Sequence, residues 1–194
     1  MRKVVAVEMV SLDGVMEAPE EWAFSYADDE MQAANAAGMA SSDALLLGRA
    51  TYEQMAAYWP NQPGGTPITD YINSVRKVVV STSLKEPLGW NNAVLIGGDV
   101  AREISKLKQR PGKNITTIGS GVLVRSLLGH GLLDELNLLV HPLILGRGRR
   151  LFEDGEDAMA LELVESKTFG TGVVSLTYRP RGRSSAAAYR ADTY

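Results

Sequence analysis

Short runs of β-branched and apolar residues alternate along this chain with segments of helical composition, and this alternation restricts its fold more than any other feature. Strands are expected over residues 3–10, 43–48, 76–82, 92–97, 114–119, 135–145, 161–169 and 172–180. Helical segments are expected to begin near residues 28, 50, 70, 99 and 122. Strands alternating with helices are typical of parallel βαβ units, so the pattern predicts a layered α/β fold.

The end of the chain departs from this alternation. Only Gly170, Thr171 and Gly172 separate the cores of the last two strand-like runs, which predicts a hairpin and an antiparallel edge on a mixed sheet. After Pro180 the residues become small, polar and basic. We therefore expect one domain over residues 1–180, followed by a C-terminal tail over residues 181–194.

Composition excludes several classes of function. The chain has 194 residues with a formal net charge of −3, which does not favour a nucleic-acid partner. It contains no cysteine and only two histidines, His130 and His141, so no metal site is expected. The first run is interrupted by Glu8 and Asp13, which does not fit a signal peptide or a membrane span. We expect a soluble, cytoplasmic protein.

The stretch ITTIGSGVLVRSLL places Gly119, Ser120 and Gly121 between a strand and a helix. One interpretation is a tight turn that needs small residues, and the other is a phosphate site at the N-terminus of the helix. The similar stretch VLIGGDVAREI differs at Asp99, a natural N-cap whose charge takes the place of an anion. Gly97 and Gly98 are therefore expected to be structural, whereas the later turn is free to receive a phosphate.

The stretch LLLGRATYEQM repeats this arrangement and adds a cation. Gly48 ends a strand, and Arg49 and Thr51 lie in the first turn of the next helix. Arg49 is suited to a paired hydrogen bond with phosphate, although a surface ion pair with Glu53 is an alternative. Helix starts at strand carboxyl ends share one edge of a parallel sheet, so a diphosphate would fit between the two turns.

Five ordered motifs, SLDGVMEAP, LLLGRATYE, KVVVSTSL, TIGSGVLVRSLL and LLDELNLLVHPLILGRGRRLF, resemble the dihydrofolate-reductase-like family. Within it the sequence is most similar to the C-terminal reductase domain of bacterial riboflavin biosynthesis. The resemblance covers residues 1–179. It implies a three-layer α/β/α sandwich around an eight-stranded, mostly parallel sheet that binds NADPH at its carboxyl edge.

The resemblance also implies roles for individual residues. It assigns cofactor binding to three groups of residues: Gly48, Arg49 and Thr51; Ser81, Thr82 and Ser83; and Gly119, Ser120, Gly121 and Val122. The loop over residues 13–22 corresponds to the family's flexible loop, which closes over nicotinamide and substrate. Candidate substrate contacts are Asp13, Met16, Trp22 and Trp59.

No proton donor is evident from the sequence. Asp28, Asp29 and Glu30 lie where dihydrofolate reductases carry a carboxylate, but acidic residues are also common in the first turn of a helix. Arg147, Arg149 and Arg150 would suit a substrate phosphate, and a solvated basic turn is the simpler interpretation. His141, inside an apolar strand, is expected to be structural.

Two functions remain open at this point. The first is an NADPH-dependent reductase that transfers hydride to a small, heterocyclic substrate, similar to 5-amino-6-(5-phosphoribosylamino)uracil reductase or dihydrofolate reductase. The second is a noncatalytic nucleotide-binding module with the same fold. Hydride transfer depends mainly on alignment, because the cofactor carries the chemistry, and this favours the reductase. The resemblance further implies a homodimer without membrane or nucleic-acid partners.

Overall fold

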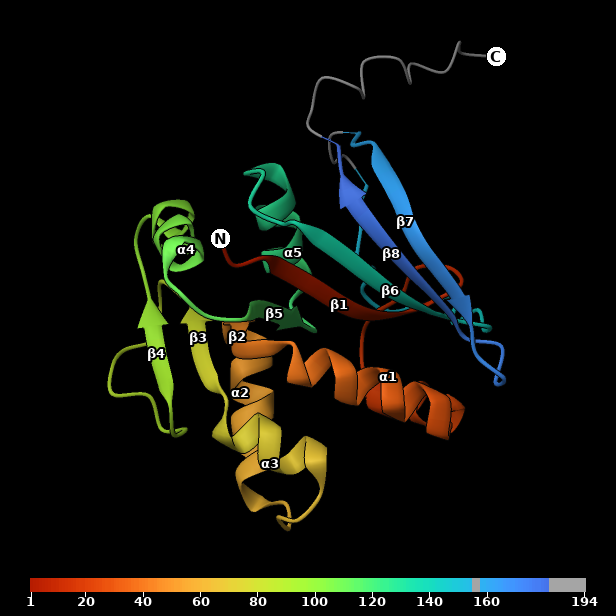
Figure 1. Cartoon of the computed structure of the whole chain (residues 1–194), viewed down its shortest axis with the longest axis horizontal. Coiled ribbons are helices and arrows are strands. Elements are labelled where there is room, and N and C mark those ends of the chain that lie inside the picture. The colour runs from red at the N-terminus through yellow and green to blue at the C-terminus, as the bar shows by residue number, and fades with distance from the viewer. Residues whose placement is uncertain (155–157, 182–194) are drawn as a thin grey trace.

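All eight expected strands lie in one mixed sheet in the computed structural model, which describes residues 1–154 and 158–181 (Figure 1). In chain order the strands are β1 (Val4–Ser11), β2 (Ser42–Gly48), β3 (Arg76–Val80), β4 (Ala93–Ile96), β5 (Asn114–Ile118), β6 (Glu135–His141), β7 (Leu161–Thr168) and β8 (Val174–Pro180). Their order across the sheet is β4-β3-β2-β5-β1-β6-β8-β7. The first six strands run parallel, and β8 is antiparallel to both β6 and β7. The expected hairpin edge is therefore confirmed.

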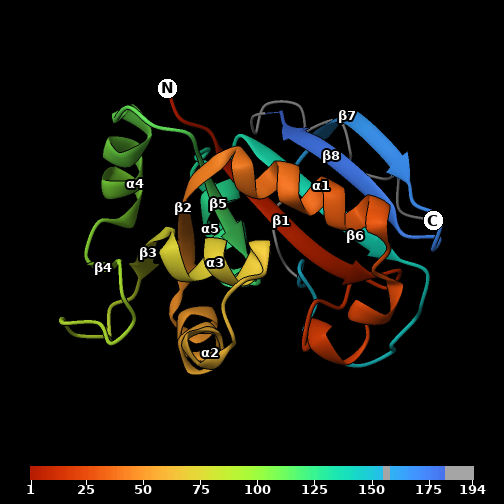
Figure 2. The same cartoon turned by 60° about the horizontal axis from the view of Figure 1, so that its bottom comes forward.

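Helices cover both faces of this sheet. On one face lie α1 (Asp29–Ala40), α2 (Arg49–Tyr58) and α3 (Pro67–Ser74). Figure 2 shows α1 and α3 in front of the strands. On the other lie α4 (Val100–Gln109) and α5 (Gly121–Gly129). Three short 3₁₀ helices complete the described part: η1 (Pro19–Glu21), η2 (Phe24–Tyr26) and η3 (Trp59–Asn61). The three-layer sandwich is thus confirmed.

Alternating side chains of the central strands hold the layers together. In β2, Ala44 and Leu46 pack in the cluster that contains the buried residues of α4 and α5. Leu45 and Leu47 point to the other face and pack with the buried residues of α2 and α3. Because both faces of the strand are covered, β2 reads as a continuous apolar run rather than as an alternation.

Most element boundaries lie within two residues of the expected ones, and proline accounts for the two that differ by more. β6 ends at His141 rather than at residue 145, because Pro142 has no N–H to continue a ladder. α3 begins at Pro67 rather than near residue 70, since proline suits the first turn of a helix and the Thr66 hydroxyl caps it. The expected tail lies outside the described residues from residue 182 onwards.

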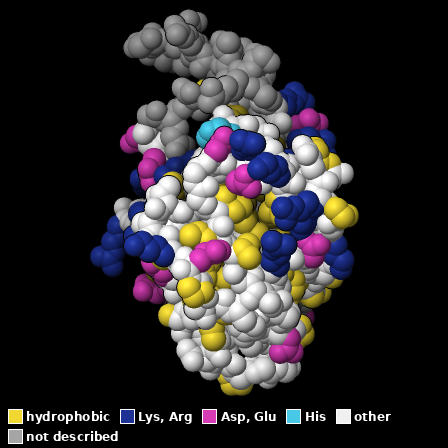
Figure 3. Space-filling model, turned by 90° about the vertical axis from the view of Figure 1, so that its left-hand side faces the viewer, with side chains coloured by type: hydrophobic (Ala, Val, Ile, Leu, Met, Phe, Trp, Pro, Cys, Tyr) yellow, Lys and Arg dark blue, Asp and Glu magenta, His cyan; other side chains and the backbone are white. Residues whose placement is uncertain are grey.

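The surface beside β4 and α4 has mixed charge. Figure 3 shows Lys and Arg side chains on this face interspersed with Asp, Glu and hydrophobic side chains. This face therefore carries no field of one sign. Among the helices that the structure describes, none is long and apolar enough to cross a membrane.

Candidate functional site

Two helix N-termini at the carboxyl edge of the sheet differ from the others in how they are capped. α1, α3 and α4 are capped by the side chains of Asp28, Thr66 and Asp99, as expected for Asp99. In α2 and α5 the N-cap residues, Gly48 and Ser120, make no side-chain capping hydrogen bond. β2 and β5, which precede these helices, are neighbouring parallel strands, so the two uncapped N-termini lie at the same sheet edge.

A chain of hydrogen bonds joins these two turns. The Gly48 N–H donates to Ser120 Oγ at 3.0 Å, and Ser120 Oγ donates to Thr51 Oγ1 at 2.9 Å. Thr51 Oγ1 in turn donates to the Gly119 carbonyl at 2.9 Å. Each hydroxyl therefore both accepts and donates, which sets the two turns in one geometry before any ligand arrives. Gly48, Thr51, Gly119 and Ser120, expected from the resemblance to share a site, are brought together.

Arg49 extends this site toward the end of β3. Its Nη1 lies 3.4 Å from Ser83 Oγ, and its Nε lies 4.0 Å from a carboxylate oxygen of Glu53. The alternative ion pair is thus present at the limit of contact distance, and the side chain remains 56% exposed. Ser81 is buried and its hydroxyl accepts hydrogen bonds from the N–H groups of Ser83 and Leu84. Ser81 therefore shapes the turn, while Ser83 and the neighbouring Thr82 are exposed.

The glycine turn before α5 has one glycine that the backbone conformation requires and one that it does not. Gly119 has φ +65°, a conformation that disfavours other residues, so it is needed for the turn itself. Gly121 has no such strain, but a Cβ there would lie 2.6 Å from Met16 Sδ. Val122, the next residue, is 73% exposed. The missing side chain at Gly121 thus lets Met16 lie against the start of α5, where the N–H groups of a helix N-terminus would suit a phosphate.

The loop over residues 13–22 is tied to the segment that follows β6. Asp13 accepts hydrogen bonds from the N–H groups of Leu145 and Gly146, and its pKa is lowered to about 2 by the Ser11 hydroxyl and these two N–H groups. Glu17 contacts the side chain of Arg149 at 3.0 Å.

Arg150 adds two contacts to the same loop. Its Nε donates to the Asp13 carbonyl at 2.9 Å, and its guanidinium lies 3.9 Å from the Asp13 carboxylate. Arg149 and Arg150 stay exposed, by 68% and 53%, as expected of a solvated basic turn, but their charges face the loop rather than solvent alone. Both side chains are paired with groups of the loop, because the chain returns beside β1 after β6.

An aromatic cluster lies at the carboxyl end of β6. The rings of Trp22 and Tyr26 meet His141 edge-on, at centroid distances of 5.2 and 5.6 Å. His141 is fully buried, its Nδ1 lies 2.9 Å from the Leu139 carbonyl, and burial lowers its pKa. The structural role expected for His141 is consistent with these contacts. Trp59, by contrast, packs against the core cluster of α2 and α3.

The three candidate acids lie at the start of α1. Asp28 caps the helix by accepting from the Met31 N–H at 2.7 Å, and Glu30 pairs with Lys167 at 2.8 Å. Asp29 is exposed in the first helical turn. Their helix-stabilising roles are therefore visible, whereas no contact singles one of them out as a proton donor. No cluster of metal-binding side chains occurs within residues 1–154 and 158–181.

Glu8, in the middle of β1, is a site residue that sequence reasoning missed. Its side chain is 1% exposed, and its Oε2 accepts a hydrogen bond from the Gly119 N–H at 2.9 Å. Burial raises its pKa to about 8. The signal was present in the sequence, because a carboxylate in the centre of an apolar strand is rarely buried without a specific partner.

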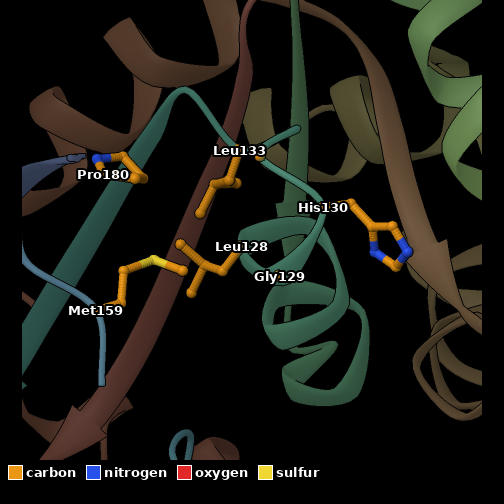
Figure 4. A pocket seen from close by; sticks show the side chains of 7 residues that line it. Leu128, Gly129, His130, Leu133, Met159 and Pro180 are labelled. Carbon is orange, nitrogen blue, oxygen red and sulfur yellow. The ribbon is translucent and has the colours of Figure 1, made fainter. Parts of the chain in front are cut away.

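Neither of two cavities in the described part of the chain is lined by the two turns that Ser120 and Thr51 join. One, of about 280 Å³, lies where β1 and β6 end and is lined by Asp13 among the four expected substrate contacts. The other, of about 420 Å³, lies at the C-terminal end of α5, opposite the glycine turn. Figure 4 shows Leu128, Leu133 and Met159 around this second cavity, with the His130 ring directed away from them. Only the first of these two cavities lies beside the loop over residues 13–22.

Comparisons with known proteins identify the family of this chain. Residues 2–175 match the family described as the RibD C-terminal domain. The uncharacterized protein YyaP of Bacillus subtilis (strain 168) is 34% identical over 143 residues, which are 72% of this chain and 75% of YyaP.

Solved structures show the same fold at lower identity. A Shewanella sp. PV-4 protein whose name refers to riboflavin biosynthesis is 23% identical, with a TM-score of 0.75 over 93% of this chain and 99% of that one. A Thermotoga maritima diaminohydroxyphosphoribosylaminopyrimidine deaminase/5-amino-6-(5-phosphoribosylamino)uracil reductase is 15% identical, with a TM-score of 0.62. This chain spans 57% of that longer protein and 93% of its own length aligns. The chain belongs to the RibD C-terminal domain family, a family of reductase domains.

Proposed function

We propose that the protein is an NADPH-dependent reductase that transfers hydride to a small heterocyclic substrate. The observation that carries this proposal is the pair of uncapped helix N-termini, of α2 and α5, joined through Ser120 and Thr51 at one sheet edge. Unpaired N–H groups and partial positive charge at such a place favour a diphosphate. Arg49 lies beside them with an exposed guanidinium, which suits the additional phosphate of NADPH.

The chain's own residues would bind the cofactor, align it with the substrate and shield the reacting groups from water. Gly48, Thr51 and the turn over residues 119–121 would hold the diphosphate, and Arg49 with Ser83 would contact the adenosine phosphate. When bound, the cofactor supplies the hydride. The loop over residues 13–22, with Met16 above the start of α5, would exclude water from the reacting groups.

The substrate class follows from the family rather than from one contact. The Thermotoga maritima protein named above carries a uracil-derivative reductase in its name, which supports a heterocyclic substrate of similar kind. The cavity beside Asp13, about 280 Å³ and mostly apolar in its lining, suits a flat ring more than a highly charged molecule. We therefore propose a pyrimidine- or pterin-like heterocycle.

Calorimetric titration with NADPH and with NADH tests the cofactor assignment. We expect tighter binding of NADPH, and Arg49→Ala should weaken it by ten- to hundredfold, since a charge-assisted hydrogen bond contributes about 1.5–3 kcal/mol. Arg102→Ala is the matched control, because Arg102 is an exposed arginine in the first turn of a helix that Asp99 already caps. Equal affinities for both cofactors, or an unaltered Arg49→Ala, would contradict the assignment.

A noncatalytic nucleotide-binding module remains the second candidate, because Asp28 and Glu30 are engaged in helix contacts. It predicts binding of NADPH without turnover. A screen of heterocyclic substrates that follows loss of the reduced cofactor separates the two functions. Oxidation that depends on both substrate and protein supports the reductase.

We further propose a homodimer. β7 is the outermost strand of the sheet, and its Leu163 and Val164 are about half exposed, which suits contact with a second copy. Light scattering should give twice the 21.0 kDa mass of one chain. A single species of 21.0 kDa at micromolar concentration would refute the dimer.

A further inference from the structure

Glu8 is an ionisable residue in the core whose purpose the proposed reaction does not yet explain. It lies on the face of β1 that packs against α4 and α5, where the residues two positions before and after it, Ala6 and Val10, are apolar core residues. Burying a carboxyl group among such neighbours costs free energy of folding unless the group is fully hydrogen-bonded. Glu8 lies directly beneath the turn that begins α5, and this position suggests a role for it in that turn.

The two oxygens of Glu8 differ in their contacts. Oε2 accepts the hydrogen bond from the Gly119 N–H, whereas Oε1 is buried and has no hydrogen-bond partner within the described residues. Thr117 Oγ1 on β5 is likewise buried without a partner there. Because Ala6 lies opposite Thr117 in the register of the two strands, Glu8 and Thr117 are diagonal neighbours on one face of the sheet. Glu8 thus holds the turn through Oε2, while Oε1 can still form a hydrogen bond.

The elements packed around Glu8 bring almost no charge to it. The β6 residues on this face, Leu136, Leu138 and Val140, are apolar. α5 contributes Arg125, whose guanidinium donates to the Leu151 carbonyl and pairs with Glu153 at 3.2 Å. In the loop and the segment against it, Asp13 pairs with Arg150 and Glu17 with Arg149. The other charged groups there, Glu20, Glu21 and Arg147, are exposed to solvent.

Burial consequently dominates the ionisation of Glu8. It raises the pKa of Glu8 to about 8, although the N–H groups of Gly119 and Ser120 act in the opposite direction. Near pH 7 most of the protein therefore carries a neutral Glu8. An ionised Glu8 would place a negative charge against the same turn that receives a cofactor phosphate on its other side, and like charges at such a distance repel.

We propose that Glu8 is a positioning residue of the phosphate turn and that it acts as a neutral carboxylic acid, so that NADPH binding requires a proton on Glu8. This role rests on the proposed NADPH function. The carboxyl group orients Gly119 through Oε2, and its neutrality leaves the positive end of α5 to the phosphate. Gln at this position would keep the acceptor oxygen and remain neutral at every pH, whereas Leu would remove the acceptor.

Calorimetric titration with NADPH between pH 7 and pH 9.5 tests this role in the whole protein, with thermal unfolding of every variant in parallel. The wild-type affinity should fall by up to tenfold per pH unit above pH 8, since the ionised form must first take up a proton. Glu8→Gln should bind like the wild-type protein at pH 7 and show no such fall. Glu8→Leu should bind at least tenfold more weakly at every pH, because Gly119 then lacks its acceptor.

Lys77→Met is the matched control for pH dependence. Lys77 also has a pKa of about 8, because burial lowers it, but it lies at the start of β3 and contacts Trp90 and the Asn73 carbonyl. This variant should retain the fall in affinity above pH 8. If the fall disappears in Lys77→Met, or persists unchanged in Glu8→Gln, the role of Glu8 is refuted.

A second readout needs no reaction. The carboxyl carbon resonance of Glu8, assigned by comparison with Glu8→Gln, should titrate near pH 8 in the free protein and at least one unit higher with saturating NADPH. An unshifted titration on NADPH binding contradicts the inference. If NADPH does not bind the wild-type protein at any pH, the proposed function itself fails, and binding with a pH profile independent of Glu8 overturns only the inference.

Discussion

Replacing Gly121 with valine should separate the functional role of the glycine turn from its structural role. Gly121 has an ordinary helical backbone, so Gly121→Val should change the free energy of unfolding by less than about 1 kcal/mol. The new Cβ would lie 2.6 Å from Met16 Sδ, a flexible chain end that moves aside. The valine methyl groups then occupy the approach to the N–H groups at the start of α5. Losing one charge-assisted hydrogen bond to phosphate costs about 1.5–3 kcal/mol, or ten- to hundredfold in NADPH affinity.

Gly98→Val provides the contrasting control in the same chain. Gly98 has φ +73° and no heavy atom within 4 Å of an added Cβ, so the cost there is backbone strain of about 1–2 kcal/mol. The following helix is capped by Asp99, and NADPH affinity should be unchanged. Calorimetry and thermal unfolding of both variants give the comparison. The reasoning is refuted if Gly121→Val binds NADPH normally, or if both variants lose stability alike and their folded fractions bind equally well.

Three further changes test separate parts of the structure. Asp99→Ala removes the cap of α4, so thermal unfolding should show a loss of about 1 kcal/mol while NADPH affinity stays constant. Asp13→Ala removes the acceptor of the Leu145 and Gly146 N–H groups, so limited proteolysis should cut the loop over residues 13–22 several-fold faster. An unaltered cutting rate would show that these hydrogen bonds do not hold the loop. Burial lowers the pKa of Lys77 from its ordinary value of 10.5 to about 8 in the folded protein. Between these two pH values the unfolded chain therefore binds a proton that the folded protein does not. The free energy of unfolding, measured by denaturant titration relative to Lys77→Met, should therefore rise by up to about 3 kcal/mol from pH 8 to pH 10.5.

Local patterns predicted the architecture because each strand and helix carried its own signal. β2 and β3 contain continuous apolar stretches, residues 44–47 and 78–80, that are followed by small residues. The short stretch from Gly170 to Gly172 predicted the hairpin between β7 and β8. The same local logic distinguished Asp99, which caps a helix, from Ser120, which does not. The cofactor turns could be located in this way because a helix start is defined by a few consecutive residues.

Contacts between distant segments could not be predicted in the same way. The bond between Glu8 and Gly119 exists because β1 lies beside β5, a neighbourhood that the order of the chain does not reveal. The pairing of the solvated Arg149 with Glu17 could not be predicted, because the two residues lie 132 positions apart in the chain. The residues that tune the site are thus set by strand order, whereas those that form its turns are set by local sequence.

The loop over residues 13–22 and the segment around Arg149 and Arg150 hold each other as the two parts of a latch would. Asp13 and Glu17 pair with Arg150 and Arg149, and backbone hydrogen bonds from Met16 to Arg149 and from Leu151 to Gly14 add to these pairs. If one segment opens, it must release the other. Exposed ion pairs weaken as salt screens them, and the opening rate of such a latch therefore rises with ionic strength. In a reductase limited by product release, salt would then accelerate turnover even though it weakens the binding of a phosphate-bearing cofactor.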